Sequence, residues 1–234
     1  MGRRTFQGET ADYLADPQTR RTWALNAQDG IISTAGILLG FSGAGASEAT
    51  LLLAGQAAIV AGMLTAGGAK WSETAAEREA ELSAIAEERQ DLREQPEVER
   101  AELLAYYTQK GLGAELAAEV ADALMQRSPL KAALESEHGI VRLTSRAAVV
   151  ISGLGSALAY GLGAAVPFAM AYYLPLNIEL GLILFSVLVS LVLISVLGAR
   201  TGNMDVRRTL IRTLMVAAVT IVVSYLVGTI GANT

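Results

Sequence analysis

The chain has no cysteine and only one histidine among its 234 residues. The absence of cysteine excludes disulfides, thiolate metal sites and catalysis by a thiol. One histidine, His138, is too few for a histidine-rich metal site and argues against a Ser-His-Asp arrangement. A nucleophile, a base and an orienting group cannot be assembled from this inventory. We therefore predict that the protein is not an enzyme and that it holds no tightly bound cofactor.

Charged residues are also scarce, at 18% of the sequence, whereas 52% of the residues are hydrophobic. This composition is more apolar than a soluble domain of this length needs, and it indicates a membrane protein. Most of the acidic residues lie between Glu73 and Glu137. Residues 1–21 lack the apolar core of a cleavable signal peptide, so we expect the first membrane span to direct the chain to the membrane.

Five segments have the roughly 20 mostly apolar residues that a membrane-crossing helix needs. They are residues 24–46, 49–69, 147–173, 179–199 and 208–231. The first is the least convincing as a free-standing span, because Asp29 interrupts it and it is rich in Gly, Ser and Thr. The predicted fold class is an all-α polytopic membrane protein, with five transmembrane helices and a helical cytosolic insert between helices 2 and 3.

Basic residues next to short loops predict the orientation. They gather at three places: Arg3, Arg4, Arg20 and Arg21; Arg142 and Arg146; and Arg200, Arg207, Arg208 and Arg212. Five spans put these places together on the cytosolic side, with the N-terminus inside and the C-terminus outside. The predicted divisions are a cytosolic segment (1–21), transmembrane helices 1 and 2 (22–71), the cytosolic insert (72–142) and transmembrane helices 3 to 5 (143–234).

The insert has the pattern of helices rather than strands. Residues 72–94 contain no Gly or Pro and are rich in helix formers, so they extend the second span as a helix. Pro96 predicts the start of a second helix, and Gly111 and Gly113 predict its end. Further helices are expected over residues 114–127 and 129–137, on either side of a break at Ser128 and Pro129.

Two acidic pairs in the insert are candidates for a metal site. Glu88 and Asp91 are three residues apart, as are Glu99 and Glu102, so each pair shares one helix face. A hairpin around Gln95 and Pro96 would bring the pairs together as oxygen ligands for a divalent cation. The alternative is that they are solvated helix faces. His138 offers a similar choice between a ligand and the commoner role of a cap or surface residue.

Asp29 and Lys70 have both structural and functional interpretations. Asp29 is either an N-cap at the membrane surface or a carboxylate on a cation or proton pathway. The simplest role for Lys70 is an interfacial lysine that reaches the lipid headgroups. Spacing alone does not decide between these roles.

Three segments resemble the vacuolar iron transporter family. NAQDGIISTAGILLG is similar to its first-span signature, EREAELSAIAEERQDLREQPEVERAELLAYYTQKGL to its helical insert, and VLGARTGNMDVRRTLIRTLMVAAVTIVVSYLVG to its last two spans. The resemblance implies a homodimeric exporter of Fe²⁺, Mn²⁺ or similar divalent ions from the cytosol in exchange for protons. The lipid bilayer, these ions and protons are then its partners, and no nucleic acid is expected. The implied location is the plasma or inner membrane in a bacterium, or a vacuolar-type membrane in a eukaryote.

The resemblance also assigns residues. Asp29 falls on the pathway aspartate, and the implied metal ligands are Glu88, Asp91, Glu99, Glu102 and Glu137. Where the family usually has serine-methionine and Gly-Glu-Tyr, this chain has Thr65-Ala66 and Ala69-Lys70-Trp71, so Thr65 and Lys70 are predicted pathway positions.

Methionine is missing from the insert site as well. The methionines that often precede the family's last insert carboxylate fall on Ala133 and Leu134. Thioether ligands favour softer metals, so their loss changes the expected ion selectivity. The alternative function is a membrane protein of the same fold that binds metal or a partner through the insert without transport.

Overall fold

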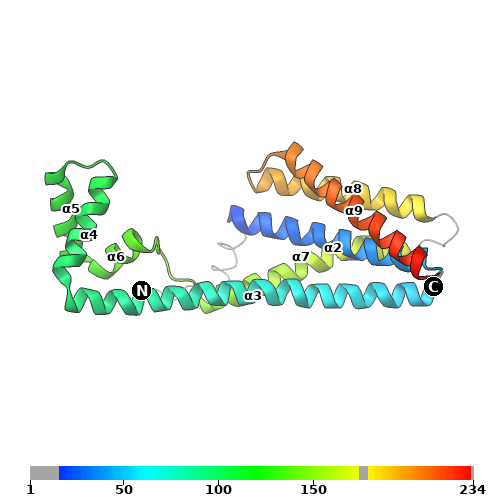
Figure 1. The fold of residues 1–234 in the computed structure, drawn as a ribbon, viewed down its shortest axis with the longest axis horizontal. Helices are drawn as coiled ribbons and strands as arrows, with labels where there is room; N and C mark the ends of the chain where they lie inside the picture. The colour runs from blue at the N-terminus through cyan, green and yellow to red at the C-terminus, as the bar shows by residue number, and fades with distance from the viewer. Residues whose placement is uncertain (1–15, 174–178, 233–234) are drawn as a thin grey trace. The chain divides into compact units, whose positions relative to one another are not determined.

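The computed structural model describes residues 16–173 and 179–232, and every regular element in these ranges is a helix. The helices are α2 (Pro17–Gly43), α3 (Glu48–Glu94), α4 (Pro96–Gln109), α5 (Ala114–Arg127), α6 (Pro129–Glu137), α7 (Arg146–Tyr173), α8 (Glu179–Thr201) and α9 (Val206–Gly231) (Figure 1). Residues Glu73–Arg146 form one compact unit, the insert, and the described residues on either side of it form the other, the bundle. The all-helical prediction is confirmed, although most of the predicted N-terminal segment 1–21 lies outside the described residues.

Four of the described helices are long and apolar enough to cross a membrane. They are α3, α7, residues Leu184–Thr201 of α8, and α9. The predicted first span corresponds to α2, which is not among the four, so the count of five spans is not confirmed. The physical reason lies in its composition, because Asn26, Gln28 and Asp29 lower the mean hydropathy of this helix.

Helix α2 nevertheless packs inside the bundle. It contacts α8 and α9 along its length (Figure 1), and Ile31, Ala35, Val187, Leu191 and Ala217 form a hydrophobic core with Ile32 between these three helices. Its buried polar residues Gln28 and Thr34 therefore face protein instead of lipid, which helps to accommodate a less apolar helix in a membrane.

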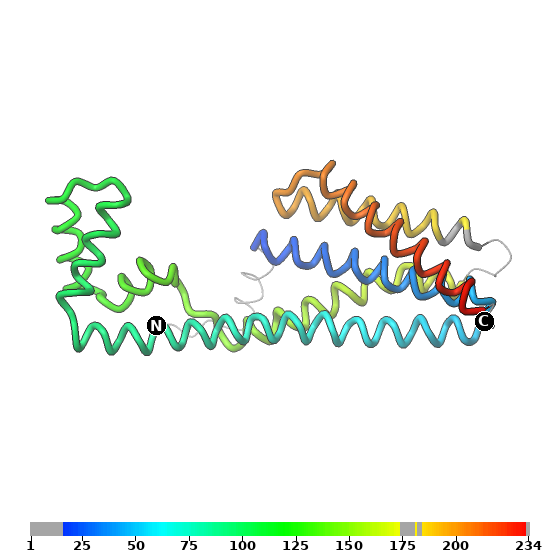
Figure 2. Tube along the Cα trace, viewed as in Figure 1, coloured from blue at the N-terminus to red at the C-terminus, as the bar shows by residue number. Residues whose placement is uncertain are grey.

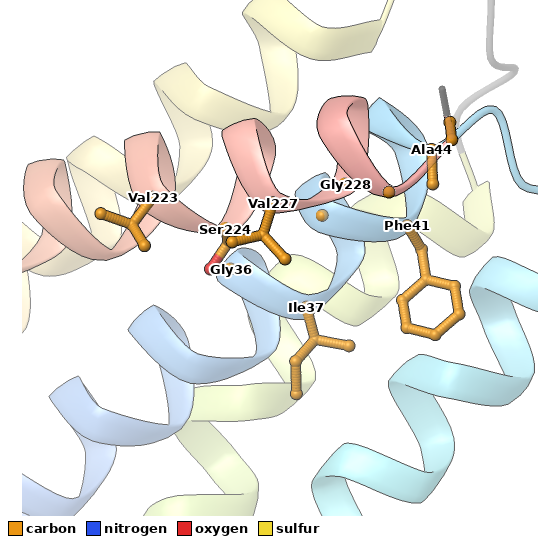
Figure 3. Close-up of a pocket in the computed structure, with 11 residues that line it drawn as sticks. Gly36, Ile37, Phe41, Ala44, Val223, Ser224, Val227 and Gly228 are labelled. Atoms are coloured by element: carbon orange, nitrogen blue, oxygen red, sulfur yellow. The ribbon is translucent and has the colours of Figure 1, made fainter. Parts of the chain in front are cut away.

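The crossing of α2 and α9 depends on small residues. A Cβ atom on Gly228 would lie 1.9 Å from the carbonyl oxygen of Gly40, so the two backbones touch where no larger side chain fits. Beside this crossing lies an apolar groove of about 600 Å³, lined by Ile37 and Phe41 of α2 and by Val227 of α9 (Figure 3). Close backbone approach at glycine is typical of helix packing in membranes.

The insert contains the predicted helices in sequence order. After α3, the chain continues as α4, α5 and α6, which pack on one another (Figure 2). Leu103, Ala121 and Ala132 form its small core, one residue from each helix. The guanidinium of Arg100 donates two hydrogen bonds to the carboxylate of Asp122 and joins α4 to α5. The insert is thus a compact helical unit around a small apolar centre.

Candidate metal centre

The break between α3 and α4 brings acidic residues from two helices together. Gln95 has φ −137° and ψ 52°, because the residue before a proline is disfavoured in the helical conformation. Its N–H donates to the carbonyl of Asp91 at 2.7 Å and closes α3, and Pro96 opens α4 without needing a donor for its nitrogen. This sharp change of direction places Glu88 of α3 near Glu99 of α4.

Two overlapping groups of potential ligands form at this break. Glu99, Glu102 and Glu137 make one group, and Glu88, Glu137 and His138 make the other, with one donor atom per residue within 4.8 Å of the others in each group. Glu137 belongs to both. The structure thus brings together four of the five predicted ligands. Asp91 is in neither group, although its negative charge contributes to raising the pKa of Glu99.

Two of these carboxylates are buried without full hydrogen bonding. Glu88 is 2% exposed and Glu99 is 5% exposed. The Oε1 atom of Glu88 lies 3.0 Å from Nε2 of His138, but Oε2 of Glu88 and Oε2 of Glu99 have no hydrogen-bond partner among the described residues. A buried carboxylate oxygen without a partner is unfavourable, so each such oxygen in a native fold needs an explanation.

The crowding of negative charge raises the pKa of two members. Burial, followed by the charges of Glu88 and Glu102, raises the pKa of Glu99 to about 7. Burial, a hydrogen bond to Glu102 and the charge of Glu88 raise the pKa of Glu137 to about 8. Both shifts mean that the ionised cluster is short of positive charge. A divalent cation would supply that charge and would use the unpaired oxygens as ligands.

Asp29 lies on an exposed face of α2, in the bundle. The next residue, Gly30, is buried against α7, where an added Cβ would lie 2.2 Å from the carbonyl oxygen of Tyr160. One turn further on, the hydroxyl of Ser33 donates to the carbonyl of Asp29 and accepts from the hydroxyl of Tyr160 at 3.1 Å. The turn that carries Asp29 is therefore held against α7 while its carboxylate remains on the open side of α2.

On another face of the same turn, Gln28 is buried and hydrogen-bonded at both polar ends of its amide. Its Nε2 donates to Ser195 of α8 at 3.1 Å, and its Oε1 accepts from Thr213 of α9 at 3.0 Å. These bonds fix the rotation of α2 about its own axis. Gln28 thereby positions its neighbour Asp29 on the face of α2 away from α8 and α9.

The other predicted pathway residues lie on α3. Thr65 is exposed and Lys70 is partly buried. Lys70 also interacts with other residues of the chain, so it is not a free cation. Their roles in a pathway stay predictions.

The comparisons with known proteins agree with this architecture. A family model described as the VIT family matches residues 21–229. The chain belongs to the VIT family. VIT proteins are transporters and not enzymes, in agreement with the inventory of side chains.

Two relatives of known name are similar over most of this VIT chain. The vacuolar iron transporter of Acanthamoeba castellanii is 30% identical over 180 residues, which cover 76% of this chain and 64% of that protein. Vacuolar iron transporter 2 of Oryza sativa subsp. japonica is 28% identical over 170 residues, which cover 71% of this chain and 68% of that protein. The chain thus spans about two thirds of the length of these relatives.

Some residues around the two sites were not predicted as functional. His138 was a recognisable candidate because it is the only histidine and follows Glu137, but the sequence does not show that it reaches Glu88, fifty residues earlier. Tyr160 and Gln28 carry no local signal at all. Their partners lie 127 residues or more away along the chain, so only the packed bundle of this VIT protein reveals them.

Proposed function

We propose that this protein exports divalent metal cations, Fe²⁺ or Mn²⁺-like ions, from the cytosol in exchange for protons. The observation that carries the proposal is the pair of buried carboxylates, Glu88 and Glu99, each with an oxygen that lacks a partner among the described residues. Membership of a transporter family supports movement of the ion across a membrane. The names of the two relatives support iron as one of the ions.

In the proposed topology α2 also crosses the membrane, which gives five spans. The burial of α2 between α8 and α9 supports this, since protein contacts replace the lipid contacts that its polar residues would disfavour. Under this proposal the insert and the arginine-rich connections lie in the cytosol, and the distribution of basic residues supports that orientation. The C-terminus then lies on the other side.

In the proposed mechanism the insert captures the ion and Asp29 assists its passage. Protons held by Glu99 and Glu137 near neutral pH leave as the ion binds, because the pKa values of these groups are raised to about 7 and about 8. In the bundle the carboxylate of Asp29 replaces part of the ion's water shell. The same carboxylate can carry a proton in the opposite direction.

We further propose that the protein works as a homodimer. The apolar part of α3 supports this, because only 11% of its most apolar 18-residue stretch is buried. Leu53, Val60 and Leu64 are exposed on this helix, with 59% to 72% of each accessible. A second copy packed on α3 would cover a surface that otherwise faces lipid alone.

Flux into liposomes tests the proposal. Purified protein should move Fe²⁺, Mn²⁺ or Co²⁺ into vesicles and acidify the opposite side, and an imposed pH gradient should change the rate. Protein-free vesicles and vesicles with the Asp29→Asn variant are the controls. If the wild-type protein moves none of these ions, with or without a pH gradient, the proposal fails.

A second candidate function is metal binding without transport, and Lys70 favours it. A lysine here stands where the resemblance expects an acidic residue, so this position offers no carboxylate to a passing cation. Under this function the insert binds metal normally and no flux occurs. Binding and flux measured on one preparation distinguish the two functions.

A further inference from the structure

The position of His138 suggests a nitrogen ligand in the insert site. His138 is the C-cap residue that directly follows α6, and its backbone N–H donates to the carbonyl of Leu134 at 3.3 Å. Gly139 follows with φ +66°, a conformation that glycine adopts without strain, and the N–H of Ile140 returns to the same carbonyl at 2.9 Å. This helix end fixes the imidazole beside Glu88 of α3.

The distances around His138 suit a metal ion. Its Nε2 lies 3.0 Å from Oε1 of Glu88, and two neighbouring ligands of an octahedral ion, each about 2.1 Å from the metal, are themselves about 3 Å apart. All three donors of the group lie within 4.8 Å. Opposite ligands at that bond length are about 4.2 Å apart, so no separation in the group has to shorten by more than roughly 0.6 Å. Glu137 is exposed, so its side chain has room to make this movement.

A second, independent observation points to a ligand at the same place. The other oxygen of Glu88, Oε2, is buried and has no hydrogen-bond partner in the described part of the chain. A hydrogen bond from His138 accounts for only one of the two carboxylate oxygens. An ion that binds between these side chains would also satisfy the second oxygen.

We propose that His138 is a metal ligand, and that with Glu88 and Glu137 it forms a mixed nitrogen and oxygen subsite next to the all-carboxylate subsite of Glu99, Glu102 and Glu137. Imidazole suits iron, cobalt, nickel and zinc, whereas Mg²⁺ and Ca²⁺ prefer oxygen ligands alone. His138 thus gives the insert a preference for transition metals that its carboxylates do not provide. This inference rests on the metal-binding part of the proposed function.

The single histidine makes a direct test possible. Full-length protein in detergent, free of any histidine tag, is produced with ¹⁵N in the imidazole rings and loaded with Mn²⁺. Because His138 is the only histidine, a ¹⁵N hyperfine coupling in the pulsed electron paramagnetic resonance spectrum can come only from its ring. We expect a coupling of the size found for directly bound imidazole. The readout is made on the wild-type protein and does not depend on a variant that folds.

A binding comparison supplies the second measurement. Loss of an outer-shell partner typically weakens metal binding by roughly tenfold, and His138→Asn should weaken Co²⁺ binding in calorimetry by more than that. The same variant should lose less affinity for Mn²⁺ than for Co²⁺. Glu135→Gln, an exposed change on the same helix, should leave both affinities unchanged.

The outcomes separate this inference from the proposed function. Bound Mn²⁺ without ring-nitrogen coupling, together with unchanged Co²⁺ affinity in His138→Asn, would overturn the ligand role of His138 and leave the carboxylate site in place. Equal losses of Co²⁺ and Mn²⁺ affinity in His138→Asn would count against the selectivity argument. A wild-type protein that binds neither ion would overturn the proposed function and this inference together.

Discussion

Gln28 in the bundle and Glu88 in the insert are almost equally buried, at 5% and 2% exposed, but their hydrogen bonding differs. Both polar ends of Gln28 have partners, on α8 and on α9. Glu88 has a partner for one oxygen and none among the described residues for the other. Burial alone therefore does not mark a site. The useful signal is a buried polar atom whose partner is not supplied by the fold.

The two environments explain the difference. Inside a membrane a polar side chain without a partner finds no water, so Gln28 is stable only if the neighbouring helices satisfy it. The insert is polar, and Glu137 and His138 at its cluster are exposed. An ion can reach the buried carboxylates there. We expect substitutions at Gln28 to change stability, and substitutions in the insert cluster to change ligand binding.

The largest effect should follow from removing two carboxylates at once. Glu99→Ala with Glu102→Ala leaves only Glu137 of the all-carboxylate subsite. Losing a residue that only supports a ligand typically weakens metal binding by about tenfold, and losing a ligand itself should weaken it by more. For two ligands we expect the Mn²⁺ affinity of the full-length protein, measured by calorimetry, to fall by at least about 100-fold.

The matched control is Glu97→Ala with Glu94→Ala, two exposed carboxylates near the same helix break. It removes the same charge and should leave the affinity within a factor of two or so, since exposed charges are screened. Equal losses in the two double variants would show that the cluster attracts ions only through net charge.

The second effect concerns Asp29, on the exposed side of the turn that Gln28 anchors. Asp29→Asn should slow cation flux by at least about tenfold while the protein stays folded, because the carboxylate is lost but the shape is kept. Flux and thermal midpoint are measured on the same preparation, with the exposed Glu79→Gln as control. The N-cap interpretation of Asp29 is wrong, because Asp16 caps α2 and Asp29 lies in the interior of this helix. Unchanged flux would therefore show that the Asp29 carboxylate has no part in a pathway.

The third effect is a pH dependence of stability in the metal-free insert cluster. The pKa of Glu99 is raised from 4.5 to about 7 and that of Glu137 to about 8. In the unfolded chain both carboxyl groups have the ordinary pKa of 4.5. Between pH 4.5 and about 8 the folded chain therefore holds more protons than the unfolded chain, and the free energy of unfolding falls as pH rises through this range. Glu99 should carry most of the dependence, because Glu137 is exposed and screened by water.

Thermal unfolding of the full-length protein with a chelator measures this dependence. The midpoint should fall across the window, and Glu99→Gln should flatten the curve because the amide cannot ionise. Saturating Mn²⁺ should offset the loss at the alkaline end, since the ion binds the deprotonated carboxylates. A midpoint that rises with pH in the absence of metal would contradict the raised pKa values.

The insert was the more predictable region because its signals are local. Pro96, Gly113 and Pro129 mark helix boundaries by their own backbone chemistry, and the structure has helices between them. The approach of Glu88 to Glu99 followed from one hairpin over a short separation. The sequence did not predict that Asp91 would fall outside both ligand groups, because this depends on the rotation of α3 relative to α4.

The bundle was harder to predict for the same physical reason. Hydropathy locates apolar helices, but it reports nothing about which face of α2 contacts α8, or about Tyr160 reaching Ser33. It also gave α2 an uncertain status, because polar residues such as the buried Gln28 lower the mean hydropathy of a helix that is packed against its neighbours. Such features are set by contacts between distant segments.

The smallest effect should come from Gln28→Leu. Leucine has a similar size but cannot bond to Ser195 or Thr213, so two hydrogen bonds between helices are lost. Hydrogen bonds of this kind in membranes contribute about 0.6 kcal/mol each, so we expect a loss near 1 kcal/mol. For a chain of this length that lowers the thermal midpoint by roughly 2–4 °C. Calorimetry should show unchanged Mn²⁺ binding, because the insert cluster is in a separate unit.

A partial rotation of α2 in Gln28→Leu would also slow flux through Asp29. The Gln28→Asn variant distinguishes such a rotation from simple destabilisation. The shorter amide keeps the donor and acceptor, so it should restore stability only if α2 shifts toward its partners. A loss of metal binding in Gln28→Leu would show that bundle and insert are coupled, and would break the division of roles between them.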